Sequence, residues 1–119
     1  MLNLKKLLTK LCEKVTTKKA TITPTHRTGD IMFRRVGDIV LCWSPYDFTT
    51  LPKQSSTTIG KIPSGYEPGL NIVTSVQNNP QRMIGVRFYP NGDISAYNYS
   101  STDLTSAENG AFFAVWTTV

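Results

Sequence analysis

Two groups of aromatic and polar side chains have the types and spacing needed to bind a sugar. Their members are Trp43, Tyr46, Asp47, Tyr97, Asn98 and Tyr99. The first three open the longest irregular segment, and the last three form part of a strand-like run in which alternation places Tyr97 and Tyr99 on one face. Sugar binding uses an aromatic platform with planar polar groups at its edge. Both kinds of side chain are present, so these six are the candidate saccharide-binding residues.

A structural role is the alternative for the same aromatic residues. Large aromatic side chains are mostly buried, which favours core or inter-subunit positions for Trp43 and Trp116. For Tyr97 and Tyr99 the binding and structural interpretations both stay open.

Catalytic chemistry has little support in the sequence. Catalysis needs a nucleophile, a positioned base and a group that stabilises developing charge. His26 is the single histidine and stands in a turn-like region, where a solvated or capping role is the favoured interpretation. Asp30, Asp38 and Asp93 each follow a glycine and are typical of turns. We therefore expect no enzyme and no cofactor.

The two cysteines, Cys12 and Cys42, show no spacing typical of a metal site. With one histidine in the chain, a structural zinc site is not expected. A disulfide between the two cysteines stays open, and buried free thiols that pack as small hydrophobes are the favoured interpretation.

The net charge of +5 is concentrated at the start of the chain. Residues 1–30 contain seven Lys or Arg against two acidic residues, whereas residues 31–119 contain six of each. A basic footprint confined to the leading segment is a weak signal for nucleic acid, because surface lysine is the usual way to solvate a helix. No apolar stretch approaches the roughly 20 residues that span a bilayer, so a soluble product is expected.

The first 17 residues are predicted to form an amphipathic helix, a coiled-coil stub. Met1, Leu4, Leu8, Leu11 and Val15 recur at the spacing of a heptad stripe. Isolated helices below about 12–15 residues are marginal in water, so the stripe must bury against copies of itself, the following domain or an upstream partner. The regular spacing favours copies of itself, and the stripe is the predicted oligomerisation surface.

Residues 18–30 are expected to be a linker, and residues 31–119 a mainly β head domain. Short strand-like runs separated by turn residues predict an antiparallel β-sandwich or barrel, jelly-roll-like in topology. The predicted strands are Ala20–Thr23, Ile31–Val36, Asp38–Ser44, Leu70–Gln77, Met83–Tyr89, Ile94–Tyr99 and Ala111–Thr117, with a brief further strand near Ile59 and Ile62.

A hairpin is the strongest local prediction. Asn91-Gly92 joins two alternating runs and suits a type I′ turn, which needs positive φ at both central residues. A second tight turn is predicted at Val36-Gly37-Asp38. The irregular segment between Ser44 and Gly69 is expected to be ordered, because six residues in it can anchor packing: Tyr46, Phe48, Leu51, Ile59, Ile62 and Tyr66.

Three motifs in order along the chain resemble the C-terminal head domains of phage minor tail, tail-fibre and receptor-binding proteins. They are Arg35-Val36-Gly37-Asp38-Ile39-Val40, Ile59-Gly60-Lys61-Ile62-Pro63-Ser64-Gly65-Tyr66-Glu67-Pro68 and Val86-Arg87-Phe88-Tyr89-Pro90-Asn91-Gly92-Asp93-Ile94. The resemblance covers about residues 30–119.

The resemblance implies a homotrimeric head around a three-fold axis, in contact with other virion proteins. It further implies a location in the phage tail, fibre or baseplate after synthesis in the host cytoplasm, and attachment to a host-surface polysaccharide. One alternative is a purely structural virion decoration or head-fibre protein with no ligand. A less favoured alternative is a basic-helix protein that binds nucleic acid or a membrane surface through its leading lysines.

Overall fold

The computed structural model describes residues 3–6, 17–79 and 82–119. Within them the protein is mainly β and every paired strand runs antiparallel to its neighbour. The strands are β1 (Thr17–Ile22), β2 (Ile31–Val36), β3 (Ile39–Ser44), β4 (Asp47–Phe48), β5 (Ser55–Lys61), β6 (Ile72–Asn79), β7 (Arg82–Phe88), β8 (Asp93–Asn98), β9 (Glu108–Asn109) and β10 (Phe112–Thr117).

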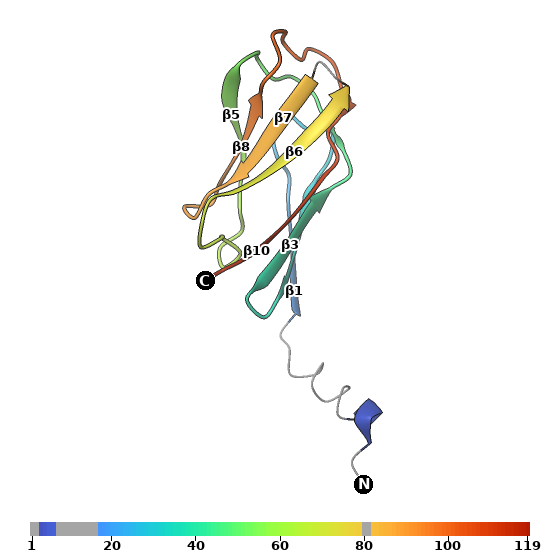
Figure 1. Cartoon of the computed structure of the whole chain (residues 1–119), viewed down its shortest axis with the longest axis vertical. Helices are drawn as coiled ribbons and strands as arrows, with labels where there is room; N and C mark the ends of the chain where they lie inside the picture. Colours follow the sequence, from blue (N-terminus) through green and yellow to red (C-terminus); the bar gives the residue numbers. More distant parts are fainter. Residues whose placement is uncertain (1–2, 7–16, 80–81) are drawn as a thin grey trace.

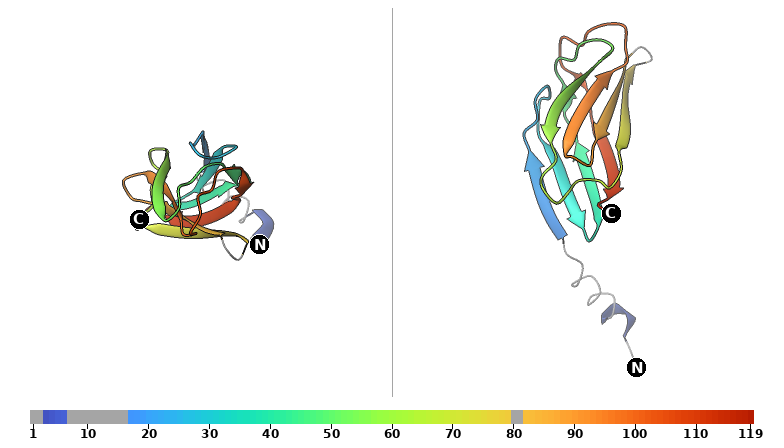
Figure 2. Two further views of the ribbon diagram at one scale, coloured as in Figure 1. Left: turned by 90° about the horizontal axis from the view of Figure 1, so that it is seen from above. Right: turned by 90° about the vertical axis from the view of Figure 1, so that its left-hand side faces the viewer.

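Two four-stranded sheets make up most of the fold. The first sheet has the order β1-β2-β3-β10, and the second has the order β5-β8-β7-β6. Figures 1 and 2 show the two sheets packed face to face, with β10 and β6 together along one side. The short strands β4 and β9 pair separately near one end of the sandwich. The predicted mainly β, antiparallel sandwich is confirmed.

The core lies between the sheets because apolar residues alternate along the strands. In β10, for example, Phe112, Ala114 and Trp116 are buried while the residues between them are exposed. The inner faces supply most of the buried apolar side chains: Ile31, Phe33, Val40, Cys42, Phe112, Ala114 and Trp116 from the first sheet, and Ile59, Val76, Ile84, Val86, Phe88, Ile94 and Ala96 from the second. Trp116 is thus a core residue, as the structural interpretation predicted.

The leading segment is described only in part. Leu4–Lys6 form a helical turn, and the Asn3 side chain caps it by accepting a hydrogen bond from the Lys5 N–H at 2.9 Å. Leu4 is 68% exposed. The remaining residues of the predicted stripe, Met1, Leu8, Leu11 and Val15, lie outside the described residues, as does Cys12.

The segment expected as a linker contains a strand. β1 covers Thr17–Ile22 and pairs with the whole of β2, from Thr17 opposite Val36 to Ile22 opposite Ile31. This strand overlaps the predicted run Ala20–Thr23, and its pairing with β2 makes it part of the first sheet. The β-branched Thr17, Thr21 and Ile22 suit this edge position, where a strand needs only one neighbour.

The two predicted hairpins are present, but one turn differs from its prediction. Gly92 has a φ of +96°, whereas Asn91 is not among the residues with positive φ, so the β7–β8 turn is not type I′. The Gly92 N–H donates to the Tyr89 carbonyl at 2.9 Å, which makes Tyr89–Gly92 a type I turn followed by a glycine bulge. Pro90, whose ring holds φ near −65°, selects this turn. At the β2–β3 turn, Gly37 takes a φ of +60°.

The long segment after Ser44 contributes two strands and is packed on the core. Of its six expected anchors, five are buried: Phe48, Leu51, Ile59, Ile62 and Tyr66. The sixth, Tyr46, is exposed. The Tyr66 carbonyl accepts a hydrogen bond from Trp116 Nε1 at 2.8 Å, and its ring meets Phe33 edge to face. These contacts close one edge of the sandwich.

Candidate functional site

The two candidate groups do not form one site. Trp43 lies on β3, and alternation with the buried Val40 and Cys42 places it on the outer face of the first sheet. Tyr97 and Tyr99 lie on the outer face of the second sheet, at and just after the end of β8. Since the sheets pack through their inner faces (Figure 2), these outer faces lie on opposite sides of the sandwich.

The strongest cluster of binding side chains lies on the second sheet. We call it the Tyr–Arg face: Arg87 and Tyr89 from β7 and its end, and Tyr97 and Tyr99 from β8 and its end. The rings of Tyr97 and Tyr99 have centroids 4.5 Å apart and are inclined to each other by 51°. Nη2 of Arg87 donates to the Tyr99 hydroxyl at 3.4 Å.

Gly85 creates the space that Tyr99 occupies. A Cβ at Gly85 would meet the Tyr99 ring at 3.0 Å, closer than nearly all such contacts. The strand register pairs Gly85 with Tyr97, so the missing side chain lies next to that ring as well. The Tyr99 ring therefore folds across β7 toward Arg87, and 46% of the residue remains exposed.

Arg87 is exposed, and its partners on this face are phenols. Hydrogen bonds to Tyr99 and then to Tyr89 raise the pKa of Arg87. The pKa of Tyr89 is lowered, first by the Ser95 hydroxyl and then by Arg87. Alternation places one carboxylate, Asp93, on the same face, and it pairs with Lys61 at 3.2 Å. Among the described residues Arg87 forms no ion pair.

Arg87 and Tyr89 were not among the candidate residues, although the sequence held a signal for them. They alternate with Ile84, Val86 and Phe88, so they lie on the polar side of a predicted strand. A hairpin with β8 brings that side next to Tyr97 and Tyr99. The missing information was the cross-strand register, which pairs Gly85 with Tyr97 and Arg87 with Ser95.

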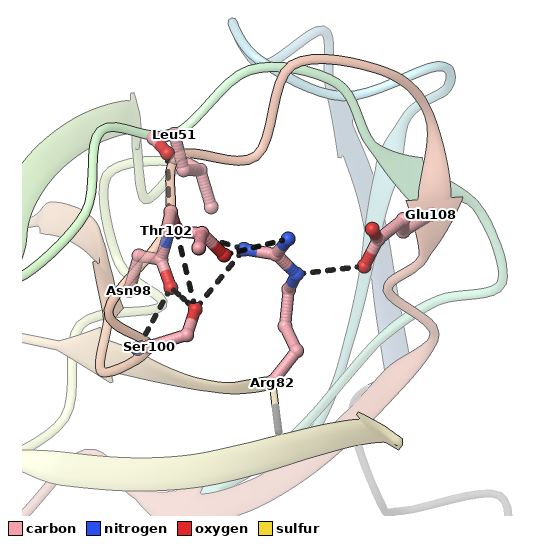
Figure 3. Close-up of polar contacts among 6 residues, drawn as sticks. All are labelled: Leu51, Arg82, Asn98, Ser100, Thr102 and Glu108. Atoms are coloured by element: carbon pink, nitrogen blue, oxygen red, sulfur yellow. Dashed lines mark hydrogen bonds and ion pairs between the residues drawn. The ribbon is translucent and has the colours of Figure 1, made fainter. Parts of the chain in front are cut away.

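Asn98 is not available to a ligand, which corrects its assignment as a candidate binding residue. It is 0% exposed, because alternation turns it inward between Tyr97 and Tyr99. Its Nδ2 donates to the carbonyls of Leu51 at 3.1 Å and Thr102 at 3.2 Å, and its Oδ1 accepts from the Ser100 N–H at 3.0 Å. Figure 3 shows how these bonds tie two loops to the end of β8.

Arg82 extends the hydrogen-bond network of Asn98 at the same end of the sandwich. Its Nη1 donates to the Ser100 hydroxyl and the Thr102 carbonyl, both at 3.0 Å, and its Nε lies 2.9 Å from a Glu108 carboxylate oxygen. Figure 3 shows the guanidinium between the Ser100–Thr102 loop and Glu108. The arrangement holds β7, β9 and the intervening loop in fixed positions, which is a structural role.

The other candidates of the first group contribute to packing. The Tyr46 ring lies on Gly29, where a Cβ would come within 2.3 Å of it. Asp47 is half-buried in β4, and its N–H donates to the Thr28 hydroxyl at 2.9 Å. His26 has a φ of +60°, and its Nδ1–H donates to the Thr50 carbonyl at 2.8 Å, which fits a capping histidine. These residues form a turn rather than an open platform.

Trp43 belongs to a second surface, which we call the apolar face. It consists of outward-facing apolar residues of β2, β3 and β10: Met32, Val36, Ile39, Leu41, Trp43, Phe113 and Val115, with one charged residue among them, Arg34, opposite Leu41. The register places Met32, Trp43 and Phe113 in one row across the three strands. Phe113 is 58% exposed and Val115 52%. An outer sheet face that meets only water is commonly polar, and this one is largely apolar.

Other kinds of site were not found in the described part of the chain. No three His, Cys, Asp or Glu side chains there are grouped in a way that would hold a metal ion. No helix within those residues has the length and apolarity to cross a membrane. Cys42 is a buried free thiol, and burial raises its pKa. The thiol therefore packs as a small hydrophobe, as the sequence favoured.

No protein-family model matches the chain, and no curated protein matches its sequence.

Proposed function

We propose that this chain is a phage virion structural protein, a trimeric tail-fibre or receptor-binding head that attaches to saccharide on the host surface. The observation that carries the proposal is the apolar face. It leaves Ile39, Phe113 and Val115, on the adjacent strands β3 and β10, about half exposed in the single chain, at a cost of roughly 25 cal/mol for every Å² of apolar surface left in water. Association through this face would recover that free energy.

A second copy of the chain is the partner that fits best. The heptad stripe at the start of the chain ends where β1 begins, and β1 is the edge strand of the same sheet that carries the apolar face. Association of the stripe with its copies would therefore bring their first sheets close together. The three motifs that resemble those of phage tail and fibre heads support three copies and a place in the virion.

The oligomeric state of the full chain tests the proposal. Light scattering coupled to size-exclusion chromatography should give the mass of a trimer at micromolar concentration. The double variant Phe113→Thr with Val115→Thr keeps β-branched side chains on β10 and removes apolar surface, so it should dissociate while its circular dichroism stays unchanged. Val73→Thr, an exposed position on the second sheet, is the matched control and should remain trimeric. A monomeric parent protein would overturn the proposal.

The virion assignment needs a separate measurement. Peptide mass spectrometry of purified phage particles should detect the chain at a copy number that is a multiple of three. Its absence from particles in which other structural proteins are detected would refute the virion role.

A further inference from the structure

We propose that the Tyr–Arg face binds an acidic saccharide, with Arg87 holding the anionic group and the rings of Tyr97 and Tyr99 packing against the sugar. This inference rests on the proposed attachment to saccharide and adds the site and the chemical class of the ligand. The anionic group on the sugar can be a carboxylate, a sulfate or a phosphate, because each presents oxygens that accept hydrogen bonds from the Arg87 guanidinium.

The charge of the face is the first argument. Arg87 is exposed, and its Nη2 donates to the Tyr99 hydroxyl at 3.4 Å. Phenols orient a guanidinium without neutralising it, and the carboxylate on this face, Asp93, is paired with Lys61 at 3.2 Å. A positive charge held in place by neutral partners retains donors for an anion, and guanidinium geometry suits bidentate contact with oxyanions.

The aromatic surface is the second argument. Tyr97 and Tyr99 present large, rigid side chains that lose little conformational entropy on binding. Their ring faces carry negative quadrupole density, which attracts the partially positive C–H groups of a sugar ring. Because the two rings are 4.5 Å apart and lie beside Arg87, one sugar residue can touch a ring and the guanidinium at once.

The preorganisation of the face is the third argument. The Tyr99 ring fills the space above Gly85, and its hydroxyl accepts a hydrogen bond from Arg87 Nη2 at 3.4 Å. An arginine that is already positioned pays less entropy when it binds. Two serines flank the aromatic pair in the strand register, Ser56 opposite Tyr97 and Ser75 opposite Gly85, and the exposed Val73 lies opposite Arg87. These serines can hydrogen-bond sugar hydroxyls.

Binding to matched acidic and neutral glycans tests the inference. The full chain is titrated by calorimetry with tetragalacturonate against tetragalactose, sulfated against unsulfated galactobiose, and mannose 6-phosphate-terminated against plain mannotriose. We expect at least one acidic glycan to bind about tenfold or more tightly than its neutral partner, with an affinity that falls as salt rises. The pair that shows the difference identifies the anionic group.

Three variants locate the site. Arg87→Gln should weaken acidic-glycan binding by about tenfold or more. Tyr99→Phe removes the hydroxyl that positions Arg87 and should cause a smaller loss, about threefold. Lys18→Gln removes the same charge from exposed β1 in the first sheet and is the matched control, expected to leave binding unchanged. Circular dichroism and the oligomeric mass of each variant show that fold and assembly are intact.

The outcomes separate this inference from the proposed function. Two results would overturn the acidic-saccharide site and leave saccharide attachment in place. One is equal binding of neutral and acidic glycans, and the other is binding by Arg87→Gln that matches the parent protein. Binding to no glycan by a protein of trimeric mass would overturn the site and the attachment role but not the assembly. A monomeric mass with selective, Arg87-dependent binding would support the site and overturn the trimer.

Discussion

The guanidinium carbon of Arg27 lies 4.3 Å from the centre of the Phe48 ring and 4.8 Å from the centre of the Phe112 ring. The arginine is buried, and Nη2 donates to the Ser44 hydroxyl at 2.7 Å and the Tyr46 carbonyl at 2.9 Å. Burial lowers its pKa to about 10, and Asp47 partly offsets that effect. Arg27 therefore remains charged at neutral pH inside an aromatic pocket.

Replacing Arg27 should lower the free energy of unfolding in proportion to the packing contacts that the new side chain loses. Arg27→Ala removes the cation–π contacts and leaves a cavity between two phenylalanines, and we expect a loss of about 3 kcal/mol in the free energy of unfolding. Arg27→Met keeps the stem over the rings and avoids burying a charge, so it should lose half as much or less. Urea unfolding of both variants gives the comparison. Equal losses would show that the charge matters more than packing.

The buried Cys42 thiol should make stability depend on pH in alkaline solution. Its pKa is raised by burial, so between pH 9 and 10 the folded thiol keeps its proton while the unfolded thiol releases it. The unfolded state then binds fewer protons, and stability falls as pH rises, by up to about 1.4 kcal/mol per pH unit. Urea unfolding at pH 8, 9 and 10 measures this slope.

Cys42→Ala is the control for that slope. It cannot release this proton, so its stability should decline less steeply than that of the parent protein over the same range. Both proteins should carry Cys12→Ser to prevent disulfide exchange in the unfolded state. Parallel declines would contradict the protonation difference.

The stability of the fold should be sensitive to the exchange of one heavy atom in the Asn98 side chain. Asn98→Asp preserves shape but turns the donor that faces the Leu51 and Thr102 carbonyls into an acceptor, and it buries a carboxyl group. We expect a loss of about 3 kcal/mol or more. Tyr97→Phe, on the neighbouring outward position, should cost less than about 0.5 kcal/mol. Thermal unfolding of the two variants tests whether inward and outward neighbours differ in this way.

The β7–β8 turn should depend on Gly92 more than on Asn91. Gly92 has a φ of +96°, which alanine adopts only with strain, so Gly92→Ala should cost about 1–2 kcal/mol. The Asn91 side chain accepts a hydrogen bond from the Asp93 N–H at 2.9 Å, and its loss in Asn91→Ala should cost about 1 kcal/mol or less. A type I′ turn would make position 91 as restrictive as position 92. Denaturant midpoints of the two variants distinguish the turns.

Most strand positions could be predicted because their signals are local. Ile31–Val36 begins and ends where alternation predicted, and the other observed strands of the two large sheets overlap predicted runs. The short strands β4 and β9 went unpredicted, since two-residue strands hold too little alternation to show a period. The turn after Tyr89 was located correctly but typed wrongly, because Pro90 outweighed the Asn91-Gly92 pair.

The sequence by itself determined the fold class, the two hairpins and which aromatic residues are available for the surface. These features depend on period-two alternation and turn residues, which act over a few neighbouring positions. Tertiary structure decided which of those side chains meet. Only strand register brings Arg87 against Tyr99, and only sheet packing separates Trp43 from Tyr97 and buries Asn98 between two loops. These contacts join residues that are distant in the chain, so no local pattern encodes them.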